Sequence, residues 1–265
     1  AGLGLIVWLV LGRIFGAGLS ASGFHAACLL AFILLALGLV SSSLHLANRR
    51  NAWRAFARWR TSWLAREAIA ALAIWPLGAL WWFGIQTQSP ALELTAGLLL
   101  VACAVLTVWC TAMIYACLRT VPRWHSWHTR VSYPLFAAVS GGLLWWALLA
   151  TTHADRLVAL DRVRGVLTIA LALAAALKYA HWKAFAGRRA GAIDTAQALA
   201  VQGRARLFEA GHTGPTFLTR EFGFHLDPRR ALLLRWLALC MAFALPAMLI
   251  GWPTHSGATA LAWIA

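Results

Sequence analysis

Three side chains that can exchange protons stand at the ends of strongly apolar segments. His45 follows the apolar run AACLLAFILLALGLV and the three serines at 41–43, and the basic stretch 49–60 comes after it. Glu67 opens a second apolar run, and Tyr115 lies near the end of a third. A neutral imidazole can donate a hydrogen bond, and a charged one can deliver a proton at physiological pH. We therefore expect proton-coupled chemistry at these segment ends.

Six apolar runs long enough to cross a membrane determine where these side chains lie. Of the 265 residues, 62% are hydrophobic and only 12% are charged, whereas soluble domains carry about 25% charged residues. A membrane-crossing helix needs about 20 mostly apolar residues. The runs are 20–45, 67–85, 91–118, 131–152, 160–182 and 229–251.

Two shorter apolar segments, 1–12 and 256–265, are interpreted as truncated halves of two further crossings. The sequence thus predicts an all-α, polytopic transmembrane helix bundle with eight spans, the first and last of them truncated in this chain. We expect one membrane domain over 1–265, without a soluble domain. The long connection 183–228 is predicted to carry a surface helix that rests on the bilayer.

Cationic residues concentrate in alternate connections. Connections 46–66, 119–130 and 183–230 hold 17 Lys and Arg residues, and the intervening connections hold four. Cationic connections mark the cytoplasmic side of a membrane protein, so the net charge of +15 indicates membrane topology rather than nucleic-acid binding. We therefore place His45 and Glu67 at the cytoplasmic face of a bacterial inner membrane.

Further polar side chains reach the same membrane level in this topology. Arg119 follows the run 91–118, Lys178 and His181 end the run 160–182, and Ser42 lies near the end of the first run. Ionisable groups within spans usually face a cavity or a partner, although long cationic side chains can also extend to the interface. A quinone head group has two carbonyl oxygens and takes up two electrons and two protons, so this set of donors predicts a quinone site.

A b-type haem is the alternative use of the histidines, with His45 and His181 at one level. Spacing singles out no pair, and the five cysteines lie in apolar runs without C-x-x-C spacing. We therefore expect no metal centre in this chain. Cys103, Cys110 and Cys117 recur every seven residues, which predicts a seam between helices.

The stretches SSSLHLANRRNAWRAFARWRTSWLAREAI (41–69) and YACLRTVPRWHSW (115–127) resemble the membrane-anchor subunit of dimethyl-sulfoxide-reductase-type molybdoenzymes. The resemblance implies a protein that exchanges electrons between a quinone, ubiquinone or menaquinone, and an iron–sulfur subunit, whose own partner carries molybdopterin. It also implies that His45 and Glu67 belong to the quinone site, with Tyr115 beside them.

The elements KYAHWKAF (178–185) and GHTGPTFLTREFGF (211–224) look more like the anchor of quinone-linked sulfite dehydrogenases with cytoplasmic catalytic subunits. The predicted function is therefore the transfer of electrons from sulfite oxidation to quinone. One alternative is the anchor of a dimethyl sulfoxide or other oxyanion reductase that takes electrons from quinol. An alternative from another class is a small-solute transporter, but the sequence has no internal repeat of the kind common in transporters.

Overall fold

The structure is a computed structural model that describes residues 1–16, 19–44, 49–119, 121, 123–152, 157–185 and 227–251. All regular secondary structure in these residues is helical, which confirms the all-α fold. The helices are α1 (Gly2–Ile14), α2 (Ala21–Leu44), η1 (Arg49–Arg58), α3 (Trp63–Gln86), α4 (Pro90–Ala116), α5 (Trp127–Thr152), α6 (Leu157–Ala184), α9 (Pro228–Leu239), η2 (Cys240–Ala244) and α10 (Leu245–Gly251).

Six helical segments in the described residues have the length and hydropathy to cross a membrane. They are Ala21–Leu44, Trp63–Gln86, Pro90–Ala116, Trp127–Ala150, Val163–Ala184 and Arg229–Gly251. These segments confirm the six long runs predicted from the sequence. Helix α1 is apolar but shorter, and the predicted segment 256–265 and the predicted surface helix of 183–228 lie outside the described residues.

Helix α3 begins before the apolar run does, and this changes the position of Glu67. Ser62 is the N-cap, and its hydroxyl accepts a hydrogen bond from the backbone N–H of Ala65 at 3.4 Å. Such caps satisfy the free N–H groups of a first turn. Glu67 therefore opens the apolar run but lies one turn inside α3, facing α4.

Helix α1 lies against α2, α4 and α5. Leu5 and Ile6 are almost completely buried, and the Trp8 ring stacks on Trp145 with the ring centroids 5.3 Å apart. The indole N–H of Trp8 donates to the carbonyl oxygen of Ala138 at 2.8 Å. An indole N–H within hydrocarbon needs such an acceptor, so Trp8 fixes α1 on α5.

The last described helix contains a wide turn before a proline. Pro246 has no N–H, and its ring crowds the carbonyl of the preceding turn. The π-helical turn Cys240–Ala244 lies directly before this position, and π-turns are a common way to accommodate a break in the hydrogen-bond ladder. Phe243 belongs to this turn, and its ring centroid lies 5.8 Å from that of Phe136 on α5.

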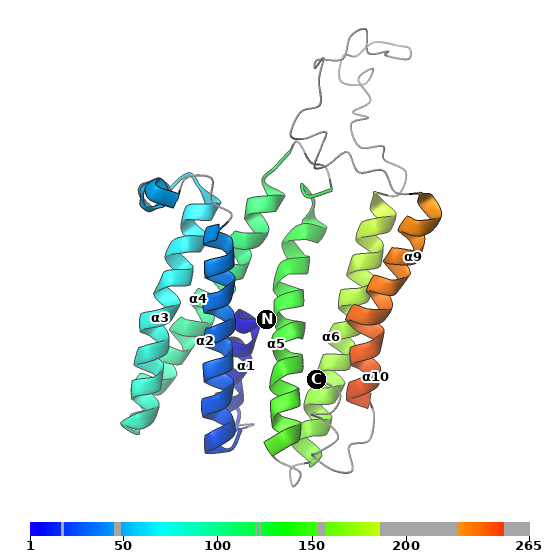
Figure 1. Ribbon diagram of the computed structural model, residues 1–265. Coiled ribbons are helices and arrows are strands. Elements are labelled where there is room, and N and C mark those ends of the chain that lie inside the picture. Colours follow the sequence, from blue (N-terminus) through cyan, green and yellow to red (C-terminus); the bar gives the residue numbers. More distant parts are fainter. Residues whose placement is uncertain are drawn as a thin grey trace.

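The two ends of the bundle differ in charge. Figure 1 shows that α2, α4 and α6 finish on the side where α3, α5 and α9 begin, together with η1; we call this side the basic end. Arg66 of α3 holds the turn that follows η1, because its guanidinium donates to the carbonyl oxygens of Trp59 at 2.8 Å and Arg60 at 2.6 Å. At the opposite end, Arg13 forms an ion pair with Glu93 at 2.6 Å.

Helices α1 and α5 pack so closely at two glycines that neither position has room for a side chain. A methyl group at Gly4 would overlap the carbonyl oxygen of Ala137, and one at Gly141 would overlap the backbone of Gly4. Overpacking of this kind costs about 1–3 kcal/mol. We expect Gly141→Ala to lower the temperature of thermal unfolding in detergent, followed by circular dichroism.

Gly38 is the matched control, because a methyl group there meets no atom within 4 Å. Alanine is about 0.5–1 kcal/mol better than glycine within a helix, so Gly38→Ala should leave the unfolding temperature unchanged or raise it. Equal unfolding temperatures in the two variants would contradict the close contact of α1 with α5.

Cysteine labelling tests the prediction that the basic end faces the cytoplasm. In a variant without native cysteines, Asn51→Cys should resist a membrane-impermeant maleimide in intact cells and react after the cells are opened. Each Lys or Arg near an anionic leaflet contributes about 1 kcal/mol, so the asymmetry favours this orientation strongly. The control Gln86→Cys, at the opposite end, should react in intact cells, and the reverse pattern would invert the bundle.

Candidate functional site

A polar cavity of about 650 Å³ lies between α4, α5 and α6, beside the start of α1. It lies toward the basic end, where α4 and α6 finish. Aromatic and aliphatic side chains form much of its wall. The polar side chains that line it include Thr111, Tyr115, Ser132, Tyr133, Lys178 and His181. The cavity thus combines apolar walls with a few hydrogen-bonding groups, as small-molecule sites do.

A hydroxyl connects Glu67 to this cavity. The Thr111 hydroxyl lines the cavity and donates to Oε1 of Glu67 at 2.5 Å. Thr111 is on α4 and Glu67 on α3, so this hydrogen bond joins two neighbouring helices. Among the described side chains, no Lys or Arg forms an ion pair with Glu67. The carboxyl group is therefore half-buried at the edge of the cavity with a hydroxyl, and not a cation, as its partner.

Two tyrosines form an aromatic wall on the α4 and α5 side. The rings of Tyr115 and Tyr133 stack at a centroid distance of 5.6 Å, with an angle of 19° between their planes. Trp124 packs edge-on against Tyr115 at 5.4 Å. All three residues line the cavity, so a planar ligand would meet aromatic surfaces there.

Lys178 and His181 approach the cavity from α6. Nε2 of His181 lies 2.9 Å from the carbonyl oxygen of Arg123. Because a carbonyl can only accept, Nε2 carries the proton, and Nδ1 is the basic nitrogen of the neutral ring. The His181 ring also stacks on that of His128 at 5.3 Å. This arrangement fixes the His181 ring and leaves one nitrogen able to take up a proton.

Ser132 carries a buried hydroxyl that has no partner among the described residues. The residue is only 7% exposed, and its Oγ forms no hydrogen bond with any described group. Within the same residues, Nδ1 of His128, one turn earlier on the same face of α5, and Nε1 of Trp146 are also buried without a partner. Buried polar groups nearly always have a partner. Ser132 belongs to the residues that line the cavity, although its Oγ itself has almost no exposed surface.

The structure brings together part of the predicted quinone site. Tyr115, Lys178 and His181 line the one cavity, and Glu67 reaches it through a hydrogen bond. Ser42 and Arg119 are exposed and do not belong to the lining. His45 follows the last residue of α2 and lies outside the described residues. The roles assigned to these residues stay predictions.

Sequence reasoning missed Thr111 and Ser132. Thr111 lies four residues before Tyr115, so both face the same side of α4. That spacing is a usable signal for Thr111. Ser132 stands beside Tyr133, and only the packing of α5 places both side chains at the cavity.

Two cysteines occupy the seam that their spacing predicts. The Cys103 thiol on α4 donates to the carbonyl oxygen of Ala70 on α3 at 3.1 Å, and Cys110 is buried. Cys117, at the end of α4, is exposed instead. Within the part of the sequence that the structure describes, no three His, Cys, Asp or Glu side chains gather as a metal site.

Comparison with known proteins finds one family model and several related proteins. The model of the family described as DMSO reductase anchor subunit (DmsC) matches residues 3–202. The sequence is 34% identical over 273 residues to the C subunit of sulfite dehydrogenase from Allochromatium vinosum, and the match covers 95% of this chain and 82% of that relative. No solved structure matches the sequence.

Two Escherichia coli proteins match over a shorter length. The C component of anaerobic dimethyl sulfoxide reductase is 27% identical over 126 residues, which is 47% of this chain and 44% of that protein. YnfH, which is also described as part of an anaerobic dimethyl sulfoxide reductase, is 30% identical over 120 residues, or 44% of this chain and 42% of that protein. The family match includes every helix from α1 to α6, and it confirms the resemblance found in the sequence. This chain therefore belongs to the family of dimethyl sulfoxide reductase anchor subunits.

Proposed function

We propose that this protein passes electrons from an iron–sulfur subunit to a quinone whose head group binds in the polar cavity. The observation that carries the proposal is the Ser132 hydroxyl, which is buried without a partner among the described residues and belongs to a side chain that lines the cavity together with Lys178 and His181. Hydroxyl and ammonium groups donate hydrogen bonds to carbonyl oxygens, and His181 can donate from Nδ1 once that nitrogen is protonated, since its Nε2–H is held by the Arg123 carbonyl. The stacked pair of Tyr115 and Tyr133 offers a face for a planar ring.

Reduction adds two electrons and two protons to the quinone, and each ring carbonyl oxygen becomes a hydroxyl. In this proposal, His45 delivers one proton. Protonated Glu67 supplies the other: it donates to the Thr111 oxygen, and the Thr111 hydroxyl, which donates to Glu67 in the resting arrangement, turns and passes its own proton to the quinone. The positive charge of Lys178 stabilises the negative charge that develops on the ring oxygens as electrons arrive. In this proposal, the residues of this protein bind the head group and donate protons to it, while the electrons come from the iron–sulfur subunit.

Sulfite is the proposed source of the electrons. A molybdopterin subunit would convert sulfite and water into sulfate, two protons and two electrons, and the iron–sulfur subunit would pass the electrons on. The similarity to the sulfite dehydrogenase protein covers 95% of this chain, whereas that to the C component of dimethyl sulfoxide reductase covers 47%. The family match itself supports the second candidate, an anchor that oxidises quinol for a reductase.

The basic end is the proposed docking surface for the iron–sulfur subunit. It exposes Trp53 and Trp59, at 65% and 52% of their surface. Arg54 lies over the Trp53 ring at 5.5 Å, and Arg60 lies over the Trp59 ring at 5.4 Å. Arginine and aromatic side chains are enriched in protein–protein interfaces. An acidic face on the iron–sulfur subunit would complement these arginines.

Substitution of Ser132 tests the proposal, because we expect it to change the KM for quinone without lowering the stability of the protein. Ser132→Ala removes a buried, unpaired polar group, so we expect the unfolding temperature of the quinone-free protein to stay the same or rise. The same change removes a hydrogen bond to the quinone and should raise the KM for quinone by about three- to tenfold. Thermal unfolding and steady-state kinetics of the purified complex measure the two effects.

Ser140→Ala is the matched control, because Ser140 lines the same cavity but already donates to the carbonyl oxygen of Ala137 at 3.3 Å. Its KM for quinone should not change. A clear loss of stability in Ser132→Ala, without an effect on the KM, would mean that the hydroxyl has a structural partner, and this would remove the support for the proposal.

His45→Ala tests the proposed proton donor. We expect quinone-linked turnover to fall by about 10²–10⁴-fold, which is the usual contribution of general acid catalysis. Oxidation of sulfite by soluble artificial acceptors should survive, because that reaction does not need the anchor. His25→Ala is the control, since His25 packs on Trp82 near the opposite end of the bundle. Unchanged quinone turnover in His45→Ala would rule out the assignment.

A further inference from the structure

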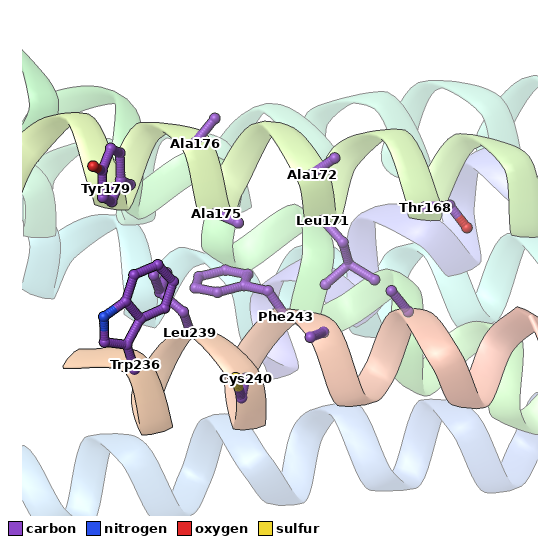
Figure 2. A pocket seen from close by; sticks show the side chains of 12 residues that line it. Thr168, Leu171, Ala172, Ala175, Ala176, Tyr179, Trp236, Leu239, Cys240 and Phe243 are labelled. Carbon is purple, nitrogen blue, oxygen red and sulfur yellow. The ribbon is translucent and has the colours of Figure 1, made fainter. Parts of the chain in front are cut away.

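A second cavity, of about 570 Å³, lies between α6 and the helix formed by α9, η2 and α10. Figure 2 shows Leu171 and Tyr179 on α6 facing Trp236, Leu239 and Phe243 on the opposite helix. The remaining lining is mostly alanine, at positions 172, 175, 176, 244 and 247. The small side chains leave an apolar groove between two helices that run side by side (Figure 1).

The groove lies beside the polar cavity. On α6 the groove is lined from Thr168 to Tyr179, and the polar cavity is lined by Lys178 and His181. Lys178 and Tyr179 are neighbours in the sequence, so the two spaces adjoin near the end of α6, and the groove extends from there along α6 toward the bilayer interior.

Two phenylalanines form the boundary between the compartments. Phe136 lines the polar cavity, and Phe243 lines the groove. Their ring centroids are 5.8 Å apart, so the two spaces are separated by a pair of side chains and not by a helix. The π-helical turn that contains Phe243 lies at this junction.

The chemistry of the two compartments fits an amphipathic molecule. The cavity offers hydroxyl, ammonium and imidazole groups, whereas the groove is lined mostly by alanine, leucine and phenylalanine. Its polar groups are the Thr168 hydroxyl, the Cys240 thiol, and Tyr179 and the Trp236 indole at the end nearest Lys178. Hydrocarbon fills such a groove without leaving polar groups unpaired, and its volume lies in the usual range for ligand pockets.

We propose that this groove holds the isoprenoid tail of the quinone whose head group occupies the polar cavity. The inference rests on the proposed function and adds a separate subsite for the tail. The groove adjoins the polar cavity at the Phe136–Phe243 pair, and this adjacency favours the quinone tail over the acyl tail of a bulk lipid. Binding then requires the Phe136 and Phe243 side chains to part around the first units of the tail.

The test compares quinones that share one head group and differ in tail length. In Ala175→Leu and in Ala244→Leu, larger side chains fill the groove from its two sides. For a quinone with several isoprene units, we expect the KM of the complete complex to rise by about tenfold or more. For the same head group without a tail, the KM should stay at the value of the parent complex.

Ala180→Leu is the matched control, because Ala180 is exposed on α6 and does not line the groove. Its KM values for both quinones should equal those of the parent. A quinone with a photoreactive tail should also label the peptides 168–179 and 236–247 in the parent complex, and labelling should fall in Ala175→Leu.

The outcomes separate the two proposals. If the groove variants change neither KM, or change both equally, the tail subsite is wrong while quinone reduction stands. Loss of a co-purifying phospholipid from the variants, with unchanged quinone kinetics, would identify a lipid site and overturn the tail subsite. If the parent complex reduces no quinone of any tail length, the proposed function itself fails.

Discussion

Hydrocarbon offers no hydrogen-bond partners, and the arrangement of this bundle depends on that constraint. The Trp8 indole is paired with a backbone carbonyl on a neighbouring helix, and so is the Cys103 thiol. Leaving such a group unpaired in an apolar medium costs several kcal/mol. Within the described residues, three buried side-chain atoms lack such a partner: Nδ1 of His128, Oγ of Ser132 and Nε1 of Trp146. Of these three residues, Ser132 belongs to the lining of the polar cavity.

The positions of the spanning helices follow from the sequence because length and apolarity alone decide which segments can cross a bilayer. The exact ends follow less well, since they depend on capping. Ser62 starts α3 before the apolar run begins, so that Glu67 lies within the helix, opposite Thr111. A hydrophobic pattern alone does not locate such a start, because the residues between the cap and the run are mixed in polarity.

The membrane level of the site residues was predictable, but their rotation about the helix axes was not. Topology alone places Tyr115, Lys178 and His181 near one end of the bundle, and all three line the cavity. Arg119 and Ser42 are at helix ends too, yet they are exposed. Which face turns inward depends on contacts such as that between α1 and α5 at Gly4 and Gly141, and no single helix encodes that contact.

Helix α6 explains how one bundle can handle a molecule with two unlike ends. Its final turns carry Lys178 and His181 near the basic end, and its middle carries alanines that leave room beside α9 and α10. Cationic groups are least costly near the interface, and small residues let a hydrocarbon tail enter where the bilayer is already apolar. From the middle of α6 to its final turns, the lining changes from apolar to polar, as the bilayer does from its interior to its interface. A quinone bound in this way would keep the orientation that it has in the lipid, with its head group at the interface and its tail in the hydrocarbon.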